Sequence, residues 1–346
     1  MSRILAVRLD SDGDVLLAGP AIRALANGAE VDLLVSPAGE RAAHLLPGSR
    51  HELVFDAPWC GYEPPALDPA AAQDLIYRLA RRRYDRAVIF TSFHQSPLPM
   101  ALLARMAGIP YVAGTSDDYP GSLLDLRHRR AGGHEVDAAL DLARATGAVL
   151  PAGDDGRLAV RRPLPDVGRL VPSGPFVVVH PGASVPSRAL RGGHARRIVS
   201  ALLAKRYDVV VTGVAAEAGL VRQATAPGAR ELAGRTSLAQ LAAVLERAAC
   251  VVVGNTGPAH LAAAVGTPVV SMYAPVVPAE RWAPYGVPSI VLGDQHAACR
   301  ETRARECPVP GHPCLSDVEP SQVASAVDAL THPTVVVGAR ARVGAG

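Results

Sequence analysis

Short apolar runs alternate along the chain with longer segments in which apolar residues recur every three or four positions. Short runs rich in Val, Ile and Leu are typical of buried parallel strands, and the periodic segments are typical of amphipathic helices. In the first half, the pattern predicts strands over residues 4–9, 31–36, 86–91 and 111–114 and helices over residues 70–82 and 98–107. After residue 175 it predicts strands over residues 176–180, 208–213, 230–232, 250–254 and 269–273 and helices over residues 193–205, 215–224, 237–247 and 258–265.

A polar segment rich in Pro and Gly, residues 151–175, separates the two alternating regions and predicts a linker. Strands that alternate with helices form parallel sheets, so the sequence predicts an α/β fold with two Rossmann-like domains whose strand ends face a cleft. We place a first domain at residues 1–165, a second at 172–320, and a closing helix and tail at 321–346. In that last segment the helix is expected over residues 321–330 and a loose tail over 333–346.

Composition narrows the possible functions. The chain has 346 residues and a net charge of +3, and no basic run is interleaved with aromatic residues, which argues against a nucleic-acid partner. No run of about 18 apolar residues predicts a transmembrane helix, and the apolar run near Met1 is too short for a signal peptide. We therefore expect a cytoplasmic protein that meets any membrane-linked acceptor by peripheral contact with the inner membrane.

Three of the five cysteines, Cys299, Cys307 and Cys314, fall within one short stretch near His296 and His312. No CxxC pair occurs among them, so a zinc site is the weaker interpretation and reduced structural thiols are the stronger one. We expect neither a metal nor another cofactor.

The stretch CVVVGNTGPAHLAAAVG, residues 250–266, combines a short strand, a Gly-rich turn and an Ala-rich helix, and Pro258 suits the start of that helix. A helix N-terminus directs unpaired N–H groups and a positive dipole end at one point, which is a natural seat for phosphate. Thr256 adds a hydroxyl group, and His260 lies in the first helical turn. The alternative is an ordinary turn between a strand and a helix.

Three acids follow the first predicted strand at every second position, Asp10, Asp12 and Asp14, with Gly13 between the last two. In an extended loop their side chains would point to one side, toward the cleft. Nearby negative charge raises the pKa of a carboxyl group, so Asp14 is predicted to act as a general base. The alternative is that Asp14 caps the apolar helical segment that follows it.

The first strand of the second domain ends at His180, and Gly182 and Ser184 form the turn after it, with Arg188 and Arg191 next. Cations beside two turns that present N–H groups fit a pyrophosphate leaving group. A solvated basic loop would have the same sequence pattern.

Two further turns contain candidate residues for binding a ribose and a base. Thr212 and Gly213 end the next strand, and Glu217 follows where a carboxylate can accept hydrogen bonds from ribose hydroxyls, although a surface helical glutamate is the alternative. Thr236 and Ser237 precede a predicted helix, so one of them is expected to cap it, and this turn can also border a base.

Four motifs occur in order along the chain: GDVLLAGPAIRAL near the start, HPGAS followed by an arginine, LAGRTSLAQLAAVL, and GNTGPAHLAAAVGTPVVSMYAP. Together they resemble glycosyltransferase family 9, the ADP-heptose heptosyltransferases of lipopolysaccharide assembly and their relatives, over residues 3–330. The resemblance implies the GT-B fold, in which two Rossmann-like domains flank the active site. It also implies sugar transfer from a nucleoside diphosphate with inversion and without a metal.

The resemblance implies roles for single residues. Asp14 matches the catalytic Asp of the family, and Ser184 falls in the turn that binds the donor phosphates. Glu217 matches a Glu that binds ribose, and Thr236 matches the position that lines the adenine.

The family's diphosphate-binding turn matches Thr256, Gly257 and His260. Arg188 stands where relatives usually have a lysine, in a chain whose 35 basic residues include a single lysine. Asn255 departs from the Asp common in relatives, which contacts the donor sugar, so the identity of the sugar stays open.

The resulting set comprises the catalytic residue Asp14, the acceptor-side residues Asp10, Asp12 and Gly13, and the donor-binding residues His180, Gly182, Ser184, Arg188, Thr212, Gly213, Glu217, Thr236, Asn255, Thr256, Gly257 and His260. The predicted function is transfer of a sugar, with heptose from ADP-heptose favoured, to a hydroxyl of a glycan, glycolipid or small molecule. Two alternatives are a UDP-sugar epimerase of the same fold and a non-catalytic nucleotide-sugar-binding relative. An NAD dehydrogenase is disfavoured, because no GxGxxG motif follows the first strand.

Overall fold

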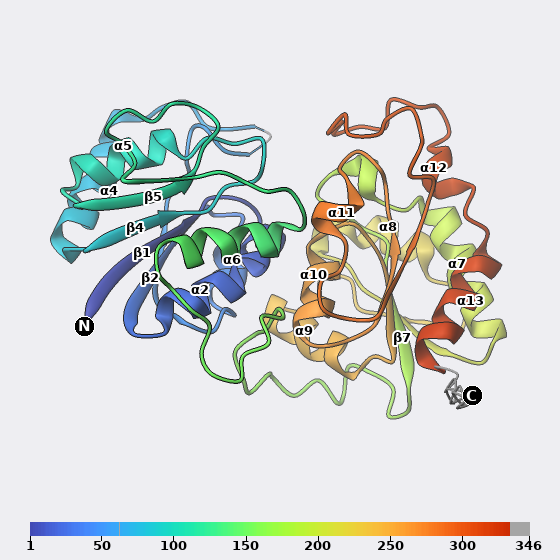
Figure 1. Cartoon of the computed structure of the whole chain (residues 1–346). Helices are drawn as coiled ribbons and strands as arrows, with labels where there is room; N and C mark the ends of the chain where they lie inside the picture. The colour runs from blue at the N-terminus through green and yellow to red at the C-terminus, as the bar shows by residue number, and fades with distance from the viewer. Residues whose placement is uncertain (62, 333–346) are drawn as a thin grey trace, which may run out of the picture.

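The computed structural model describes residues 1–61 and 63–332, and the tail predicted over residues 333–346 lies outside them. The chain forms two α/β halves that stand side by side, the first coloured blue to green and the second yellow-green to red in Figure 1. Each half contains one six-stranded sheet in which all paired strands run parallel. The predicted fold class, two Rossmann-like α/β units, is confirmed.

The two sheets have the same topology. The first has the order β3-β2-β1-β4-β5-β6 and the second the order β12-β11-β10-β7-β8-β9. The strands of the first sheet are β1 (Ser2–Arg8), β2 (Ala29–Val35), β3 (Ser49–Val54), β4 (Arg86–Ile89), β5 (Tyr111–Thr115) and β6 (Leu126–His128). Those of the second are β7 (Phe176–His180), β8 (Asp208–Val211), β9 (Arg230–Glu231), β10 (Cys250–Gly254), β11 (Val269–Met272) and β12 (Ser289–Leu292).

Counted from its own first strand, each sheet therefore follows the doubly wound order 3-2-1-4-5-6. In this order the connections leave the two central strands in opposite directions and open a crevice at their carboxyl ends. One crevice lies between β1 and β4, and the other lies between β7 and β10. Ligands bind at such crevices, so the strand order alone marks where a site should lie.

Helices cover both faces of each sheet. Those of the first half are α1 (Asp12–Leu17), α2 (Gly19–Ala26), α3 (Glu40–Ala43), α4 (Pro69–Arg82), α5 (Leu98–Met106) and α6 (Glu135–Ala145). Those of the second half are α7 (Gly192–Ala204), α8 (Ala218–Ala224), α9 (Leu238–Arg247), α10 (Gly257–Ala264), α11 (Ala279–Trp282), α12 (Pro313–Ser316) and α13 (Pro320–Thr331), with 3₁₀ turns η1 (Pro186–Arg188) and η2 (Ala215–Glu217). Across residues 1–61 and 63–332, every helix falls short of the length and apolarity needed to cross a bilayer.

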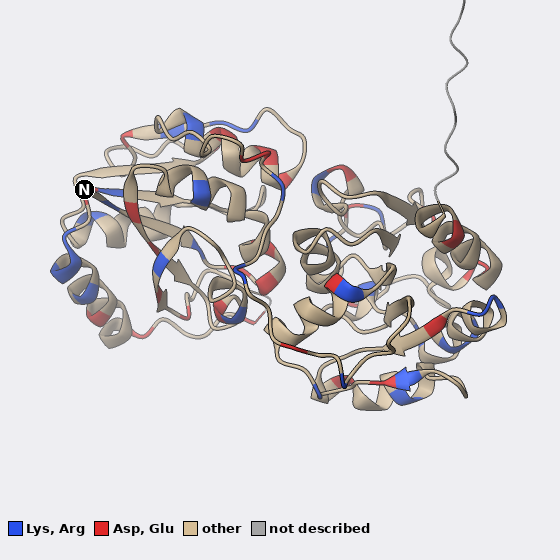
Figure 2. Ribbon diagram, turned by 90° about the horizontal axis from the view of Figure 1, so that it is seen from below, with Lys and Arg blue, Asp and Glu red and all other residues tan. Residues whose placement is uncertain are grey.

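Apolar packing joins the two halves. Helices α4 and α5 share one buried cluster with the first sheet, and α7, α8 and α13 share another with the second. A third cluster contains residues of α1, α2 and α6 together with residues of α9 and α10. The inner helical layers of the two sheets therefore bury apolar surface against each other. Basic and acidic residues are interspersed over both halves (Figure 2).

Several elements differ from those predicted. The strands β3, β6 and β12 and the helices α2, α3, α6, α11 and α12 were not predicted, and the helix predicted over residues 215–224 is η2 followed by α8. The linker prediction agrees with residues 151–175, which contain neither helix nor strand. Asp154 in this linker accepts from Arg23 of α2 at 2.6 and 2.8 Å, and Arg162 pairs with Glu246 of α9, so the linker is bound to both halves.

The N-termini of α1 and α10 meet where the two halves join. A Cβ atom at Gly13, in the first turn of α1, would lie 3.1 Å from Gly257 Cα and 3.1 Å from His260 Cδ2. Real side chains rarely approach this closely, so glycine at position 13 lets the two helices come together.

A second contact joins α6 to the segment after α11. The Nε2 atom of His134 lies 2.9 Å from the carbonyl oxygen of Ala283, and its ring centroid lies 4.7 Å from that of Tyr285. The Tyr285 hydroxyl donates to Asp137 at 2.7 Å. These polar contacts fix the relative orientation of the halves beside the apolar cluster.

Replacing Gly13 with Ala should destabilise the protein by about 1–3 kcal/mol, the usual effect of overpacking, because Gly257 and His260 must move to admit the methyl group. Chemical denaturation measures the change. The control is Gly219→Ala in α8, where a Cβ meets no atom within 4 Å, and it should stabilise the helix by about 0.5–1 kcal/mol. Equal effects of the two substitutions would show that the helix junction is not tightly packed.

Candidate active site

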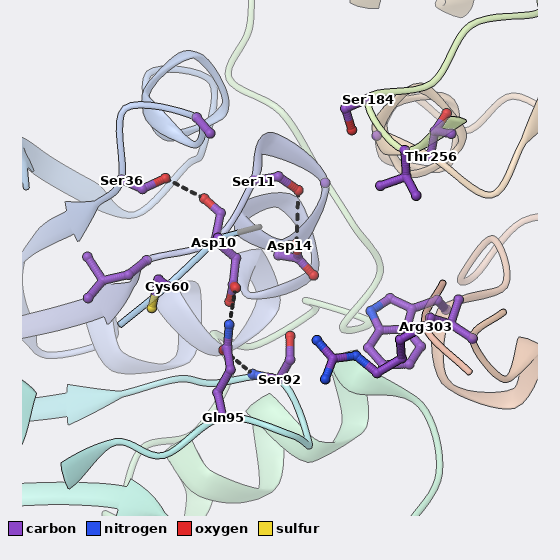
Figure 3. Close-up of a pocket in the computed structure, with 18 of the residues that line it drawn as sticks. Asp10, Ser11, Asp14, Ser36, Cys60, Ser92, Gln95, Ser184, Thr256 and Arg303 are labelled. Atoms are coloured by element: carbon purple, nitrogen blue, oxygen red, sulfur yellow. Dashed lines mark hydrogen bonds between the residues drawn. The ribbon is translucent and has the colours of Figure 1, made fainter. Parts of the chain in front are cut away.

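Two adjoining cavities open where the two crevices face each other. The larger has a volume of ≈ 450 Å³ and the smaller a volume of ≈ 280 Å³. Figure 3 shows the larger one, with Asp10 and Asp14 on the side of the first sheet and Ser184 and Thr256 on the side of the second. The residues that line both cavities are Ser11, Gly13, Ala38, Ser184, Thr256 and Gly257.

The structure gathers almost every predicted site residue around these cavities. Those that line only the larger cavity are Asp10, Asp14, Arg188, Asn255 and His260. Those that line only the smaller cavity are Asp12, His180, Gly182, Gly213, Glu217 and Thr236. Thr212 lines neither. The site therefore consists of two cavities that share part of their wall, with residues from both crevices around them.

A buried guanidinium joins the two acids of the larger cavity. Arg8, at the end of β1, is 3% exposed, and its Nε atom lies 3.0 Å from Asp10 Oδ2. Its Nη2 atom donates to Asp14 Oδ1 at 3.2 Å and to Ser92 Oγ at 2.8 Å. A guanidinium presents its donors in a rigid planar fork, so Arg8 fixes the positions of both carboxylates. Gln95 completes the group by donating to Asp10 Oδ1 at 2.5 Å.

This group shifts the pKa values of the two acids in opposite directions. Burial alone would raise the pKa of Asp14, but the Arg8 guanidinium and the Ser11 hydroxyl outweigh it, and the pKa lies below its ordinary value. Burial raises the pKa of Asp10 to about 6, although Arg8 acts against it. The expectation that neighbouring acids raise the pKa of Asp14 is therefore wrong, because Arg8 lies between them. Asp14 is ionised at neutral pH and can accept a proton.

Two further expectations for the acidic loop are corrected. The chain turns helical at Asp12, so Ser11 is the N-cap residue and Asp14 is the third residue of α1, where it accepts from Ser11 Oγ at 2.9 Å. The Asp12 side chain does not point in the same direction as those of Asp10 and Asp14. Its carboxylate accepts from Arg41 at 2.7 and 3.0 Å and from the Ala42 N–H at 2.9 Å, and so it fixes α3 beside the smaller cavity.

Two buried polar atoms beside the junction of the cavities lack a partner among the described residues: Arg188 Nε and Thr256 Oγ1. Buried polar groups are nearly always hydrogen-bonded, so unpaired donors beside a cavity are candidates to bind a ligand. Helix α10 begins at this point with Thr256 as its N-cap residue and carries no acid in its first turn. A positive helix end, a guanidinium and unpaired donors together suit an anion.

His260 contributes as a neutral ring. Burial lowers its pKa to about 4, and Arg188 acts in the same direction, whereas Asp14 acts against them. At neutral pH the ring therefore offers one N–H donor and one acceptor nitrogen.

A chain of contacts shapes the wall of the smaller cavity. The hydroxyl of Thr212 bonds to His180 Nδ1 at 2.9 Å, and His180 Nε2 lies 3.8 Å from Glu217 Oε2. Glu217 also accepts from the Val214 N–H at 2.9 Å. A Cβ at Gly182 would lie only 2.1 Å from the Glu217 carboxylate. Thr212 therefore positions His180, and glycine at position 182 leaves room for the carboxylate that faces the cavity.

Asn255 has a structural role that the sequence did not reveal. Its Nδ2 donates to the Ala274 carbonyl at 3.1 Å and its Oδ1 accepts from the Ala274 N–H at 3.1 Å, so the side chain joins the end of β10 to the end of β11. Each end of the amide keeps one further hydrogen or lone pair. Contact with the donor sugar therefore stays a prediction for a side chain that is already fixed in place.

The sequence interpretation missed several lining or supporting residues: Arg8, Arg41, Ser92, Gln95, Trp282 and Arg303. Of the two candidate caps, Ser237 is the N-cap of α9 and Thr236 lines the smaller cavity. The residues after β4 were detectable in principle, because β4 lies beside β1 in the doubly wound order and its carboxyl end must face the same crevice.

The five cysteines are free thiols, and Cys250, Cys299 and Cys314 are buried. Cys299 and Cys314 pack in the apolar cluster behind the second sheet. Among residues 1–61 and 63–332, no three side chains of His, Cys, Asp or Glu gather as a set of metal ligands.

Comparison with known proteins gives the family. The sequence profile of "Glycosyltransferase family 9 (heptosyltransferase)" matches residues 73–312, which is more than half of the chain. The chain therefore belongs to glycosyltransferase family 9 and is a glycosyltransferase of the heptosyltransferase type.

Individual relatives agree with this assignment. Lipopolysaccharide heptosyltransferase 1 of Pseudomonas aeruginosa is 28% identical over 328 residues, with 84% of this chain and 83% of that protein covered. Lipopolysaccharide heptosyltransferase 3 of Escherichia coli is 28% identical over 104 residues, and the match covers 28% of this chain and only 31% of that protein. The solved structure of E. coli ADP-heptose lipopolysaccharide heptosyltransferase II has a TM-score of 0.72 at 21% identity and shares the fold, with 96% and 98% of the two chains covered.

Replacing Asn255 with Asp should destabilise the protein by about 1–3 kcal/mol, because a carboxylate cannot donate to the buried Ala274 carbonyl. Denaturation at pH 7 measures the loss. Lowering the pH should restore part of the stability, since a protonated Asp regains a donor. Full stability of the variant at neutral pH would contradict the structural role of Asn255.

Asp10 should make folding stability depend on pH. The folded protein holds the Asp10 proton with a pKa of about 6, above the ordinary 3.8, so the stability from that proton is present below about pH 4 and is lost as the pH rises through 6. Asp10→Asn cannot ionise and should lack this loss. Urea denaturation of both proteins from pH 4 to 7 provides the test, and parallel stability curves would show that Asp10 does not titrate in this window.

Proposed function

We propose that this enzyme transfers heptose from ADP-heptose to a hydroxyl group of an acceptor, with inversion at the anomeric carbon and without a metal ion. The single observation that carries the proposal is the split of the site into two cavities joined at the N-terminus of α10. A nucleoside, a diphosphate and a sugar have the same linear order as the smaller cavity, the junction and the larger cavity.

The nucleoside would occupy the smaller cavity. Its wall offers the Glu217 carboxylate as an acceptor for ribose hydroxyls, and Thr236 together with Leu238 and Leu241 for the base. By their resemblance to the family, Glu217 and Thr236 match positions for ribose and adenine, and the solved E. coli relative is named for ADP-heptose. The resemblance and the relative's name both favour adenine over other bases.

The diphosphate would sit at the junction. Arg188 Nε and Thr256 Oγ1, which lack partners among the described residues, would donate to phosphate oxygens, and the N-terminus of α10 would add its positive end. These groups stabilise the charge that develops on the leaving nucleoside diphosphate. They would supply the positive charge that a divalent cation supplies in other transferases.

Asp14 would act as the general base from the opposite side of the larger cavity. The acceptor hydroxyl would enter beside the first sheet, lose its proton to Asp14 and attack the anomeric carbon as the bond to the diphosphate breaks. Attack from the side opposite the leaving group inverts the configuration. Arg8 would hold the carboxylate ionised before the reaction and in the orientation that the proton transfer needs.

The two halves of the chain would bind different substrates. Residues 1–165 would bind the acceptor and residues 172–320 the nucleotide sugar, with residues 321–346 closing the chain. The acceptor would be a glycan, a glycolipid or a small molecule, as the lipopolysaccharide heptosyltransferases among the relatives suggest in part. Action in the cytoplasm, with peripheral contact to the inner membrane for a lipid-linked acceptor, follows from the same family likeness.

Replacing Asp14 with Asn should lower kcat by about 10²- to 10⁴-fold, the usual contribution of a general base, and leave the Kd for ADP within about twofold. The reason is that the side chain would act on the acceptor proton and not on the nucleotide. Transfer from ADP-heptose and calorimetric ADP binding are measured together, with denaturation to confirm folding.

The matched control is Asp117→Asn, an exposed acid of the first half that lines neither cavity and should keep full activity. Turnover of the Asp14→Asn variant within about tenfold of wild type would remove Asp14 from the base role.

A further inference from the structure

The acceptor side of the larger cavity has a one-sided charge pattern. Its described lining residues from the first half include the acids Asp10, Asp14, Asp56 and Glu63 and neither lysine nor arginine. The chain contains 34 arginines, which is the 35 basic residues less one lysine, so composition does not explain their absence from this wall. Burial lowers the pKa of His94 to about 4, so the imidazole on this wall is neutral at pH 7.

The cations near this cavity are already engaged or belong to the second half. Arg8 lies beneath the wall and is bound to Asp10 and Asp14, and Arg305 pairs with Glu63. Arg188 would bind the donor diphosphate. Among the described lining residues, Arg303 from the second half is then the one remaining arginine (Figure 3).

Binding of the donor therefore makes the loaded cavity negative. Before the donor enters, four acids are matched by four arginines: Asp10, Asp14, Asp56 and Glu63 by Arg8, Arg188, Arg303 and Arg305. A nucleoside diphosphate then adds its own negative charges next to the acceptor. An acceptor with a phosphate or carboxylate beside its reacting hydroxyl would have to approach these charges in a partly desolvated space.

Two observations indicate what would be bound instead. Asp56 lies just beyond β3 at the exposed part of the cavity, and its carboxylate makes no hydrogen bond or ion pair with another described residue. His260 is 5% exposed and lines the same cavity, and its Nδ1 has no partner among the described residues. The Ser36, Ser92 and Gln95 side chains add neutral polar atoms to the wall.

We propose that the acceptor is a polyhydroxylated molecule that carries a protonated amine, such as an amino sugar or aminocyclitol, and no phosphate or carboxylate beside the reacting hydroxyl. The proposal rests on the proposed function, since it takes the larger cavity as the acceptor site. An ammonium group bonded to Asp56 gains a charge-assisted hydrogen bond, and the hydroxyls bond to the neutral polar groups.

The test uses three disaccharides of similar size and different charge: a dimer of glucosamine, a dimer of N-acetylglucosamine and a dimer of galacturonate. Each is titrated into the full-length protein saturated with ADP, with calorimetry as the readout and, in a Trp59→Phe background, the fluorescence of Trp282 in the cavity wall as a second readout. The glucosamine dimer should bind tightest, at least about fivefold tighter than the galacturonate dimer at low salt. The difference should shrink at high salt, because exposed charges are screened.

Variants at one position separate charge from shape. Asp56→Asn should weaken binding of the glucosamine dimer by about threefold and leave the neutral dimer unchanged, and Asp56→Lys should reverse the order of the charged dimers. Asp117→Asn removes an equal charge outside both cavities and should change nothing.

The outcomes separate this proposal from the one it rests on. Tighter binding of the galacturonate dimer, equal binding of all three dimers, or no binding of any dimer to protein that binds ADP would overturn the acceptor proposal alone. Failure of ADP to bind would overturn the proposed function itself.

Discussion

The close approach of α1 and α10 is the constraint on which the rest of the site depends. Both helices start at the crevice of a doubly wound sheet, and glycine at position 13 lets them meet. Two positive helix ends then face one region. Helix α1 carries Asp12 and Asp14 in its first turn, whereas α10 carries no acid there and has Arg188 beside it. The first turn of α1 contains its own carboxylates, and under the proposed function the N-terminus of α10 binds the anionic donor.

The same geometry explains the character of the proposed base. Arg8 lowers the pKa of Asp14 and so keeps its carboxylate ionised at neutral pH. The carboxylate can therefore accept a proton, but its low pKa makes it a weak base. A weak base needs a good leaving group, and in the proposed function Arg188, Thr256 and the N-terminus of α10 would stabilise that leaving group. Asp10 contacts the same guanidinium but has the higher pKa, because burial decides the direction of its shift. At Asp14 the Arg8 guanidinium and the Ser11 hydroxyl together outweigh burial and lower the pKa.

Sequence patterns predicted the sheets and the turns well, because buried strands such as β7 and β10 are continuous apolar runs. They missed β6 and β12, whose residues are mostly half-buried and give no such run. The prediction that Asp10, Asp12 and Asp14 point to one side was wrong at Asp12. The chain is helical from Asp12 onward, so side chains two positions apart no longer share a side. Ser92 was missed because its partner Arg8 is far away in sequence and is reached only through the pairing of β1 with β4.

Calorimetric titration with ADP, UDP, GDP and adenosine tests the central claim, that the two cavities hold the two ends of an adenosine diphosphate sugar. The account predicts that ADP binds more tightly than UDP and GDP, because of the base cavity, and far more tightly than adenosine, because of the junction. Tighter binding of UDP than ADP, or equal binding of ADP and adenosine, would contradict it.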